Sequence, residues 1–154
     1  MQSMSKIFVG VAVATAFSAA AHAQSPFARP EDAIKYRQSA LFIMGQHFGR
    51  IGAVVKGERP YNKDEVVHNA AIAEQMSTLH WEAFVPGTDK GNTRARPEIW
   101  SDPAKFKSAA EKMEQQMSKL AQVTKGGELG AIKTQFGETG KACKACHDEF
   151  RKKD

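Results

Sequence analysis

The sequence has only two cysteines, Cys143 and Cys146, and no stretch in which apolar and polar residues alternate as in a half-buried strand. A structural zinc site needs further cysteine or histidine ligands at comparable spacing, so the lack of a second cysteine pair argues against one. Thiol-disulfide chemistry of the thioredoxin type places its cysteines at a strand-to-helix turn, and no strand is predicted before Cys143. The lack of strands favours an all-α fold.

Clusters of one charge are also scarce. The chain has 22 basic and 17 acidic residues, a formal net charge of +5, and the basic residues are scattered along it. Only Arg151, Lys152 and Lys153 group together, and cations there suit the negative end of a helix dipole. A modest, scattered excess argues against a nucleic-acid-binding protein and favours encounter with acidic partner surfaces.

The one long apolar run lies near the N-terminus, at about residues 7–21. Lys6 precedes it and a small-x-small cleavage pattern ends at Ala23, so residues 1–23 are predicted to be a secretory signal peptide. The mature domain is then residues 24–154, which keep 21 basic residues against 17 acidic ones because Lys6 is lost. It is predicted to be one domain without a membrane span, located in the periplasm.

Against this background, residues 143–147 form a Cys-x-x-Cys-His motif. This is the attachment signal of c-type haem, because two thiols add to the porphyrin vinyl groups while the next residue offers an imidazole to the iron. Cys143 and Cys146 are therefore predicted to bind one haem c covalently, with His147 as axial iron ligand. A disulfide between the cysteines would be a short, strained loop that leaves His147 unexplained. A thiol-disulfide oxidoreductase without haem remains an alternative.

Four helices are expected, each with an apolar stripe of helical spacing. They cover about residues 30–56, 62–84, 102–125 and 128–150, and residues 85–101 form the one long loop. The stripe of the last helix comprises Leu129, Ile132, Phe136, Thr139, Cys143, Cys146 and Phe150. The prediction is an all-α antiparallel four-helix bundle with haem c bound in the core.

Capping chemistry marks three of the helix starts. Pro30 stands where the first helix opens, Asn62 precedes Glu65 by three residues as in a capping box, and Asp102 precedes Pro103.

The residue that faces the iron from the first helix decides what the iron can do. The inward stripe passes through Leu41, which cannot bind iron, so the iron is expected to be five-coordinate and high-spin in an apolar pocket open to NO or CO. Met44, one turn further on, is the rival, since a thioether there would give a low-spin electron-transfer protein. His68 and His80 are less expected ligands, because a helix histidine is usually a surface or satisfied residue. Since Leu41 is no acid or base, the protein is not expected to be an enzyme.

Four other residues leave two interpretations open. Arg37 interrupts the apolar stripe of the first helix, where it either meets a haem propionate or reaches water at the end of the bundle. Arg94 and Arg96 in the loop can reach propionates, although solvated loop arginines are the more usual case. Trp100 either covers the edge of a cofactor or anchors the loop to the core.

The chain resembles the class II c-type cytochromes, specifically the cytochrome c-prime family. The resemblance is carried by a single Cys-x-x-Cys-His near the C-terminus, a secretory signal and a four-helix pattern. More specific marks lie within residues 37–41, 56–61, 96–100 and 143–151. In this family the position matching Leu41 is apolar in five-coordinate members, while low-spin relatives carry methionine there, so the resemblance implies a high-spin site.

The resemblance also implies roles for other residues. Arg37 and Gln38 would contact the haem propionates, Leu41 and Phe84 would line the distal pocket, and Arg151 would lie beside the proximal ligand. It further implies a homodimer formed through the first two helices, periplasmic redox partners that exchange one electron, and NO or CO as small ligands.

Overall fold

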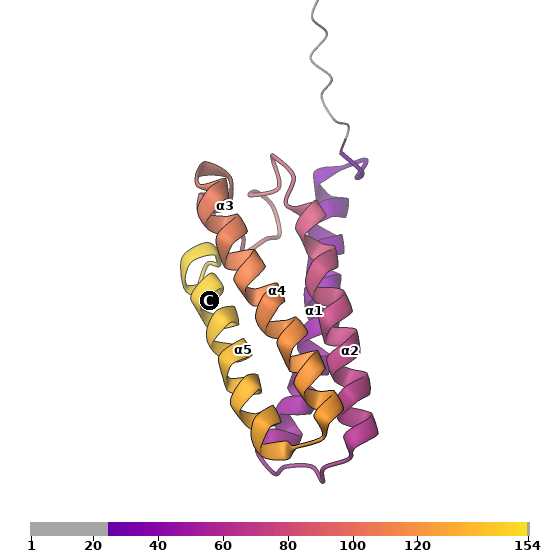
Figure 1. Cartoon of the computed structure of the whole chain (residues 1–154). Helices are drawn as coiled ribbons and strands as arrows, with labels where there is room; N and C mark the ends of the chain where they lie inside the picture. The colour runs from indigo at the N-terminus through magenta and orange to yellow at the C-terminus, as the bar shows by residue number, and fades with distance from the viewer. Residues whose placement is uncertain (1–24, 154) are drawn as a thin grey trace, which may run out of the picture.

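The computed structural model describes residues 25–153, and the predicted signal peptide lies outside the described residues. The elements are α1 (Pro30–Val55), α2 (Lys63–Leu79), a 3-10 turn (His80–Ala83), α3 (Glu98–Ser101), α4 (Pro103–Gly126) and α5 (Leu129–Phe150). Figure 1 shows the four long helices side by side, each running opposite to the one before it. The predicted all-α antiparallel four-helix bundle is confirmed.

Side-chain caps begin two of the helices as the sequence predicts. The side chain of Asn62 accepts a hydrogen bond from the backbone N–H of Glu65 at 3.1 Å. Asp102 accepts one from the N–H of Lys105, also at 3.1 Å, with Pro103 in the first helical position. Each cap satisfies a backbone donor that the helix itself leaves free, and so fixes where the helix starts.

Two boundaries differ from the prediction. α2 ends at Leu79, and the residues expected to finish it form the 3-10 turn instead. Pro86 follows closely, and since proline has no backbone N–H the chain cannot continue as a regular helix there. The predicted loop at residues 85–101 contains α3 and an isolated antiparallel bridge between Ala95 and Arg151.

α1 and α5 pack tightly near the turn that joins α4 to α5, and we call this the closed end. Phe48 of α1 stacks on Phe136 of α5, with ring centres 4.2 Å apart and planes 13° apart. Gly52 permits this approach, because a Cβ built on it would lie 2.9 Å from Cζ of Phe136. The buried side chains at this end include Ile51, Val66, Met117, Leu120 and Ile132.

Toward the other end, which we call the open end, a cavity lies between α1 and α5. A second and smaller apolar cluster borders it, formed by Ala95, Ile99 and Phe150 with the rings of Phe84, Trp100 and Phe106 packed against them. The two apolar clusters therefore lie on either side of a space that the side chains do not fill.

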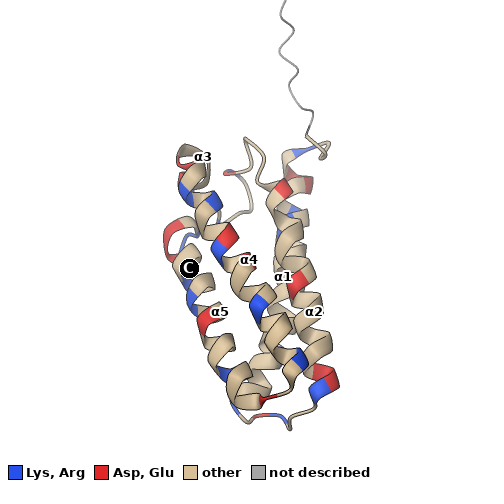
Figure 2. Cartoon of the chain, in the orientation of Figure 1, with Lys and Arg blue, Asp and Glu red and all other residues tan. Residues whose placement is uncertain are grey.

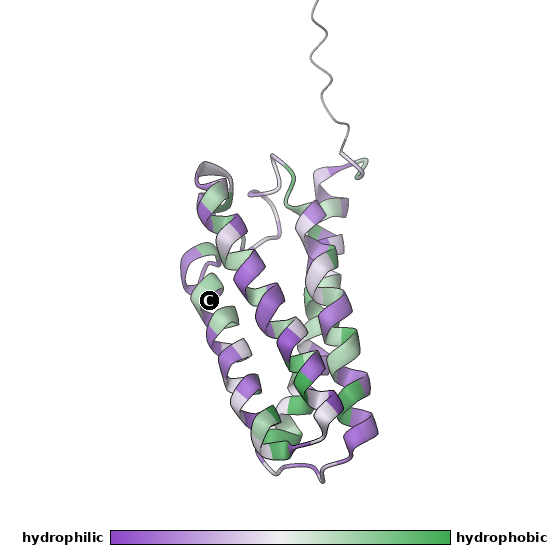
Figure 3. Ribbon diagram, in the orientation of Figure 1, coloured by the Kyte–Doolittle hydropathy of each residue, from purple (hydrophilic) through white to green (hydrophobic). Residues whose placement is uncertain are grey.

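The outer faces of the bundle are polar and carry both signs of charge. Figure 2 shows acidic and basic residues interspersed along the helices, and Figure 3 shows polar positions between apolar ones on each helix. Among the described helices, none combines the length and the apolar character that a membrane crossing needs.

Candidate functional site

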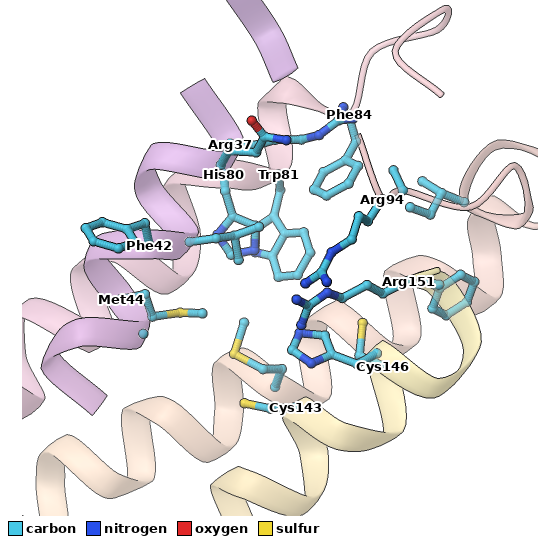
Figure 4. A pocket seen from close by; sticks show the side chains of 18 of the residues that line it. Arg37, Phe42, Met44, His80, Trp81, Phe84, Arg94, Cys143, Cys146 and Arg151 are labelled. Atoms are coloured by element: carbon cyan, nitrogen blue, oxygen red, sulfur yellow. The ribbon is translucent and has the colours of Figure 1, made fainter. Parts of the chain in front are cut away.

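The cavity at the open end has a volume of about 640 Å³ and is bounded by α1, the 3-10 turn, the loop before α3, α4 and α5. Pockets that hold small molecules and cofactors have volumes of about 300–1,000 Å³. Its apolar lining includes Leu41, Met44, Phe48, Phe84, Phe106 and Met113. Figure 4 shows Cys143 and Cys146 of α5 on one side of the cavity and Phe84 on the other.

Both thiols are half-buried and protonated at neutral pH. Burial raises the pKa of Cys143. The pKa of Cys146 is raised to about 11, chiefly by burial and also by the neighbouring Cys143 and Glu149. Because the thiolate is the reactive species in disulfide exchange, these thiols are poorly suited to that chemistry. The helix also runs unbroken through the motif, without the strand-to-helix turn of a thioredoxin-type site.

His147 lines the same cavity one helical turn after Cys143. Burial lowers the pKa of its imidazole, the positive charge of Arg94 lowers it further, and Asp148 opposes both effects. A neutral imidazole is the form that binds a metal ion. Two thiols and a neutral imidazole on one wall of an apolar cavity of this volume fit a covalently attached haem.

The predicted distal residues also reach this cavity. Leu41 and Phe84 line it, and so does Met44, the rival ligand from the same helix. Of the two histidines considered as further ligands, His80 lines the cavity, whereas His68 is exposed on α2 and does not. Leu41, Phe84 and the alternative iron ligand Met44 therefore all line one cavity.

Arg37 is buried, with 2% of its surface exposed, so it does not reach water as one interpretation held. Its Nη1 donates to the carbonyl oxygen of Ala83 at 3.0 Å and to Oγ1 of Thr88 at 2.6 Å. Its Nη2 donates to the carbonyl oxygen of Thr88 at 2.6 Å and to Oγ1 of Thr93 at 2.8 Å. The guanidinium carbon also lies 4.7 Å from the ring centre of Phe84. Arg37 thus ties the loop to α1, and of its guanidinium donors only Nε–H is left for another group.

Gln38 follows Arg37 and binds the same loop from outside. It is exposed at the cavity edge, and its Nε2 donates to the carbonyl oxygen of Asn92 at 2.8 Å. Trp100 anchors the loop as well, because its Nε1 donates to the carbonyl oxygen of Phe84 at 3.0 Å. The loop arginine Arg96 pairs with Glu98 and is not among the residues that line the cavity.

Arg94 and Arg151 meet at the cavity although they lie far apart in the sequence. The backbone N–H of Lys152 donates to the carbonyl oxygen of Arg94 at 2.8 Å, and that of Arg96 donates to Phe150 at 3.0 Å. Both arginines line the cavity, and Figure 4 shows their side chains extending toward each other. Two cations are therefore held at the edge of the site. One of them is the loop residue Arg94, for which the sequence favoured a solvated side chain.

Sequence reasoning missed the acceptors of Arg37 and the placement of His80 and Trp81. The hydroxyls of Thr88 and Thr93 carry no pattern that singles them out among loop residues. Trp81 had one signal, because it widens the apolar face of the helix predicted at about residues 62–84, and a face so wide can serve a core and a partner surface together. His80 had none that separated it from an ordinary helix histidine.

Comparisons with known proteins identify the family of the chain. The family model described as Cytochrome C' matches residues 32–151. The cytochrome c' of Alcaligenes xylosoxydans xylosoxydans is 48% identical over 127 residues, which are 82% of this chain and 98% of that protein. The cytochrome c' of Rubrivivax gelatinosus is 46% identical over 128 residues, which are 82% of this chain and 99% of that protein.

Solved structures extend the similarity to the backbone. The crystal structure of cytochrome c' from Rubrivivax gelatinosus matches with a TM-score of 0.79 and covers 82% of this chain and 99% of that one. A nitric oxide complex of a leucine-to-alanine variant from Alcaligenes xylosoxidans matches with a TM-score of 0.78 and 47% identity, covering 83% and 99% of the two chains. A carbon-monoxide-bound leucine-to-glycine variant matches at the same TM-score and identity, covering 82% and 99%.

Proposed function

The chain belongs to the cytochrome c' family, and from this premise we propose that it is a periplasmic, high-spin haem c protein that carries one electron and binds NO or CO. One observation carries the proposal: a single cavity brings together the two thiols and the imidazole of α5 and the apolar side chain of Leu41 from α1. The predicted signal peptide and the covalent type of haem support the periplasmic location.

The cofactor is haem c, which supplies a reversible one-electron couple and, at a vacant axial position of its iron, a site for a small neutral ligand. Cys143 and Cys146 are proposed to form its thioether bonds, and His147 to be its axial ligand. One helix carries all three residues, so the attachment points and the ligand keep a fixed mutual position. Covalent attachment also holds the cofactor without relying on the surrounding loops.

Leu41 and Phe84 are proposed to line the distal side. Neither has a polar group to coordinate iron or to satisfy a charged ligand, so charged and bulky molecules are disfavoured there while NO and CO are admitted. Neither is an acid or a base, so these two residues offer no catalytic group, and we propose no enzymatic role on that side.

One observation favours a second candidate, a low-spin electron carrier. Met44 lines the same cavity as Leu41, so its thioether is available on the same wall. If Met44 occupied the sixth position, the protein would transfer electrons but would not bind CO. The thiol-disulfide oxidoreductase has weaker support, because burial raises the pKa of both thiols.

The haem propionates are proposed to lie near the loop that Arg37 and Gln38 hold. Arg37 has only its Nε–H available there, and Gln38 is already bonded to Asn92. Arg151 and Arg94 bring two further cations to the cavity edge, where Arg151 is proposed to lie beside the proximal ligand. Arg94 and Arg151 would therefore share the propionate contacts with Arg37 and Gln38.

We propose a homodimer formed through α1 and α2. Phe42 on α1 is 66% exposed, Ile43 is 41% exposed, and Leu79 at the end of α2 is 39% exposed. Large apolar side chains exposed on two neighbouring helices suit a self-complementary interface. The small positive net charge suits redox partners with acidic surfaces.

The deciding experiment is an absorption spectrum of the ferrous protein before and after addition of CO. A high-spin spectrum that changes with CO is expected from a vacant axial position. A low-spin spectrum that CO leaves unchanged would overturn the proposal in favour of the Met44 candidate. Intact mass of the exported protein, with one haem added per chain, tests the covalent attachment separately.

A further inference from the structure

The proposed axial ligand lies in the least rigid part of its helix. His147 belongs to the last turn of α5, which ends at Phe150. The last four carbonyl groups of a helix have no partner within the helix, and helix ends open more readily than helix middles. A residue that binds a metal ion keeps its geometry only when its surroundings fix its own position. The last turn of α5 therefore needs support from outside the helix.

The loop and the end of the chain pair in a short antiparallel bridge. The backbone N–H of Arg96 donates to the carbonyl oxygen of Phe150 at 3.0 Å. The backbone N–H of Lys152 donates to the carbonyl oxygen of Arg94 at 2.8 Å. We call this pairing the clasp, and it joins residues 94–96 to residues 150–152.

The clasp holds the last turn of α5 through carbonyl groups that the helix leaves free. The carbonyl oxygen of Phe150 is satisfied by the loop, and that of His147 accepts from the N–H of Arg151 at 3.1 Å. Arg151 is itself the bridged residue, opposite Ala95. Ala95 and Phe150 are both buried and belong to one apolar cluster, so packing supports the pairing. The backbone of His147 is thus bonded directly to a residue of the clasp.

The clasp is also tied to the opposite wall of the cavity. Oγ1 of Thr93 accepts from Nη2 of Arg37 at 2.8 Å and from the backbone N–H of Ala95 at 3.1 Å. Arg37 lies on α1, one turn before Leu41. One hydroxyl therefore joins the helix of the proposed distal residue to the clasp. Stacked rings hold α1 and α5 together at the closed end, and this series of hydrogen bonds connects them at the open end.

We propose that Thr93 and the clasp position His147 relative to Leu41 and so fix the bond between the imidazole and the iron. Thr93 is a positioning residue, because it acts through the clasp. The inference rests on the proposed role of His147 as axial ligand and adds what sets the position of that ligand. When the clasp is weakened, the last turn of α5 opens more easily and the imidazole takes a wider range of positions.

The test is resonance Raman spectroscopy of the ferrous holoprotein, in which the iron–imidazole stretching band reports on this bond. Thr93→Val keeps a branched side chain but removes the acceptor of two hydrogen bonds. Lys152→Pro removes a donor of the clasp. Proline fits the backbone there, because the preceding Arg151 is already extended, with φ −121° and ψ 131°. Each variant should shift and broaden the band relative to the parent.

Three controls match these changes. Thr134→Val makes the same substitution at an exposed threonine of α5, whose hydroxyl donates within its own helix. Lys153→Pro makes the second substitution one position beyond the clasp. Thr93→Ser keeps the hydroxyl that accepts both hydrogen bonds. All three should show the band of the parent.

Hydrogen exchange measured by mass spectrometry shows separately whether the clasp opens. Peptides that contain residues 94–96 or 150–152 should exchange faster in Thr93→Val and Lys152→Pro than in the parent and the controls. Faster exchange with an unchanged Raman band would overturn the inference, because the clasp would open without moving His147. Unchanged exchange in both variants would overturn it as well. A parent that lacks the iron–imidazole band would refute His147 as axial ligand and the inference with it, whereas a band that the variants leave unchanged refutes the inference alone.

Discussion

The closed and open ends of the bundle use the same two helices in opposite ways. At the closed end, stacking of Phe48 on Phe136 and the absence of a side chain at Gly52 bring α1 and α5 together. At the open end the same helices bound a cavity of about 640 Å³ whose wall carries two thiols and an imidazole. Protein side chains complete the packing at one end only, and the proposed haem would complete it at the other.

This difference predicts how the two ends respond to substitution. A change at the closed end alters packing between side chains, so it should change the free energy of unfolding and leave the haem chemistry alone. A change at the open end should first alter attachment, coordination or loop position. The largest effects are therefore expected at the open end.

The largest effect is expected when both Cys143→Ser and Cys146→Ser are introduced. Without thiols no thioether can form, so covalent haem should be lost completely. Intact mass spectrometry of exported protein measures the adduct. Ala145→Ser, an exposed change between the two cysteines, is the matched control and should keep one haem per chain. A full haem adduct in the double variant would refute the assignment of α5 as the attachment helix.

Leu41→Met is expected to convert the iron site to low spin. The new thioether would lie on the cavity wall, where it can take the sixth position and lower CO affinity by at least tenfold, equivalent to at least about 1.4 kcal/mol. CO titration of the ferrous protein measures this. Ile43→Met places the same side chain at a residue outside the cavity lining and should leave CO affinity unchanged. If Leu41→Met binds CO as the parent does, Leu41 does not face the iron.

The contrast between the ends also shows what the sequence could predict. Helical spacing, the caps at Asn62 and Asp102 and the Cys-x-x-Cys-His motif are local patterns, and they were sufficient for the bundle and for the wall that α5 provides. The open end depends on contacts that local patterns do not encode. The hydrogen-bond partners of Arg37 lie 46 to 56 positions along the chain. Burial of His80 likewise depends on how the chain leaves α2, which a 3-10 turn decides.

Arg37→Met tests whether the loop closes the open end. The change keeps an unbranched side chain but removes four hydrogen bonds, leaving buried acceptors at Ala83 and Thr88 unpaired. A loss of about 4 kcal/mol in the free energy of unfolding is expected at about 1 kcal/mol per bond. Denaturant unfolding of the holoprotein measures it. Arg50→Met, at an exposed arginine of the same helix, should cost less than about 0.5 kcal/mol. Equal stability of the two variants would show that the loop does not depend on Arg37.

His80 should make the open end sensitive to acid. Burial lowers the pKa of His80 to about 4, below the value of 6.5 expected in the unfolded chain. The unfolded state then binds a proton that the folded state does not, so stability is full above pH 6.5 and falls as the pH approaches 4. At about 1.36 kcal/mol per pKa unit, His80 should account for a loss of about 3 kcal/mol across this interval. Unfolding curves at several pH values should show a shallower fall of the free energy of unfolding in His80→Phe than in the parent. His68→Phe should show the same fall as the parent. Parallel curves for the parent and His80→Phe would contradict a buried neutral imidazole.

The smallest effect is expected at the closed end, where two glycines of α1 differ only in their surroundings. A Cβ at Gly52 would meet the ring of Phe136 at 2.9 Å, whereas one at Gly49 has nothing within 4 Å. Both changes to alanine gain about 0.5–1 kcal/mol of helix propensity, but Gly52→Ala also crowds a ring held by stacking, at a cost of about 1–3 kcal/mol. Gly49→Ala should therefore stabilise the protein, and Gly52→Ala should destabilise it by about 1 kcal/mol net. Denaturant unfolding at neutral pH measures both, while the CO spectrum of each variant should match the parent.

Because the two changes share the same propensity gain, the difference between them isolates the contact that closes this end. Equal stabilisation by both would mean that Phe136 moves aside freely and that α1 and α5 are not held there by the stacked rings.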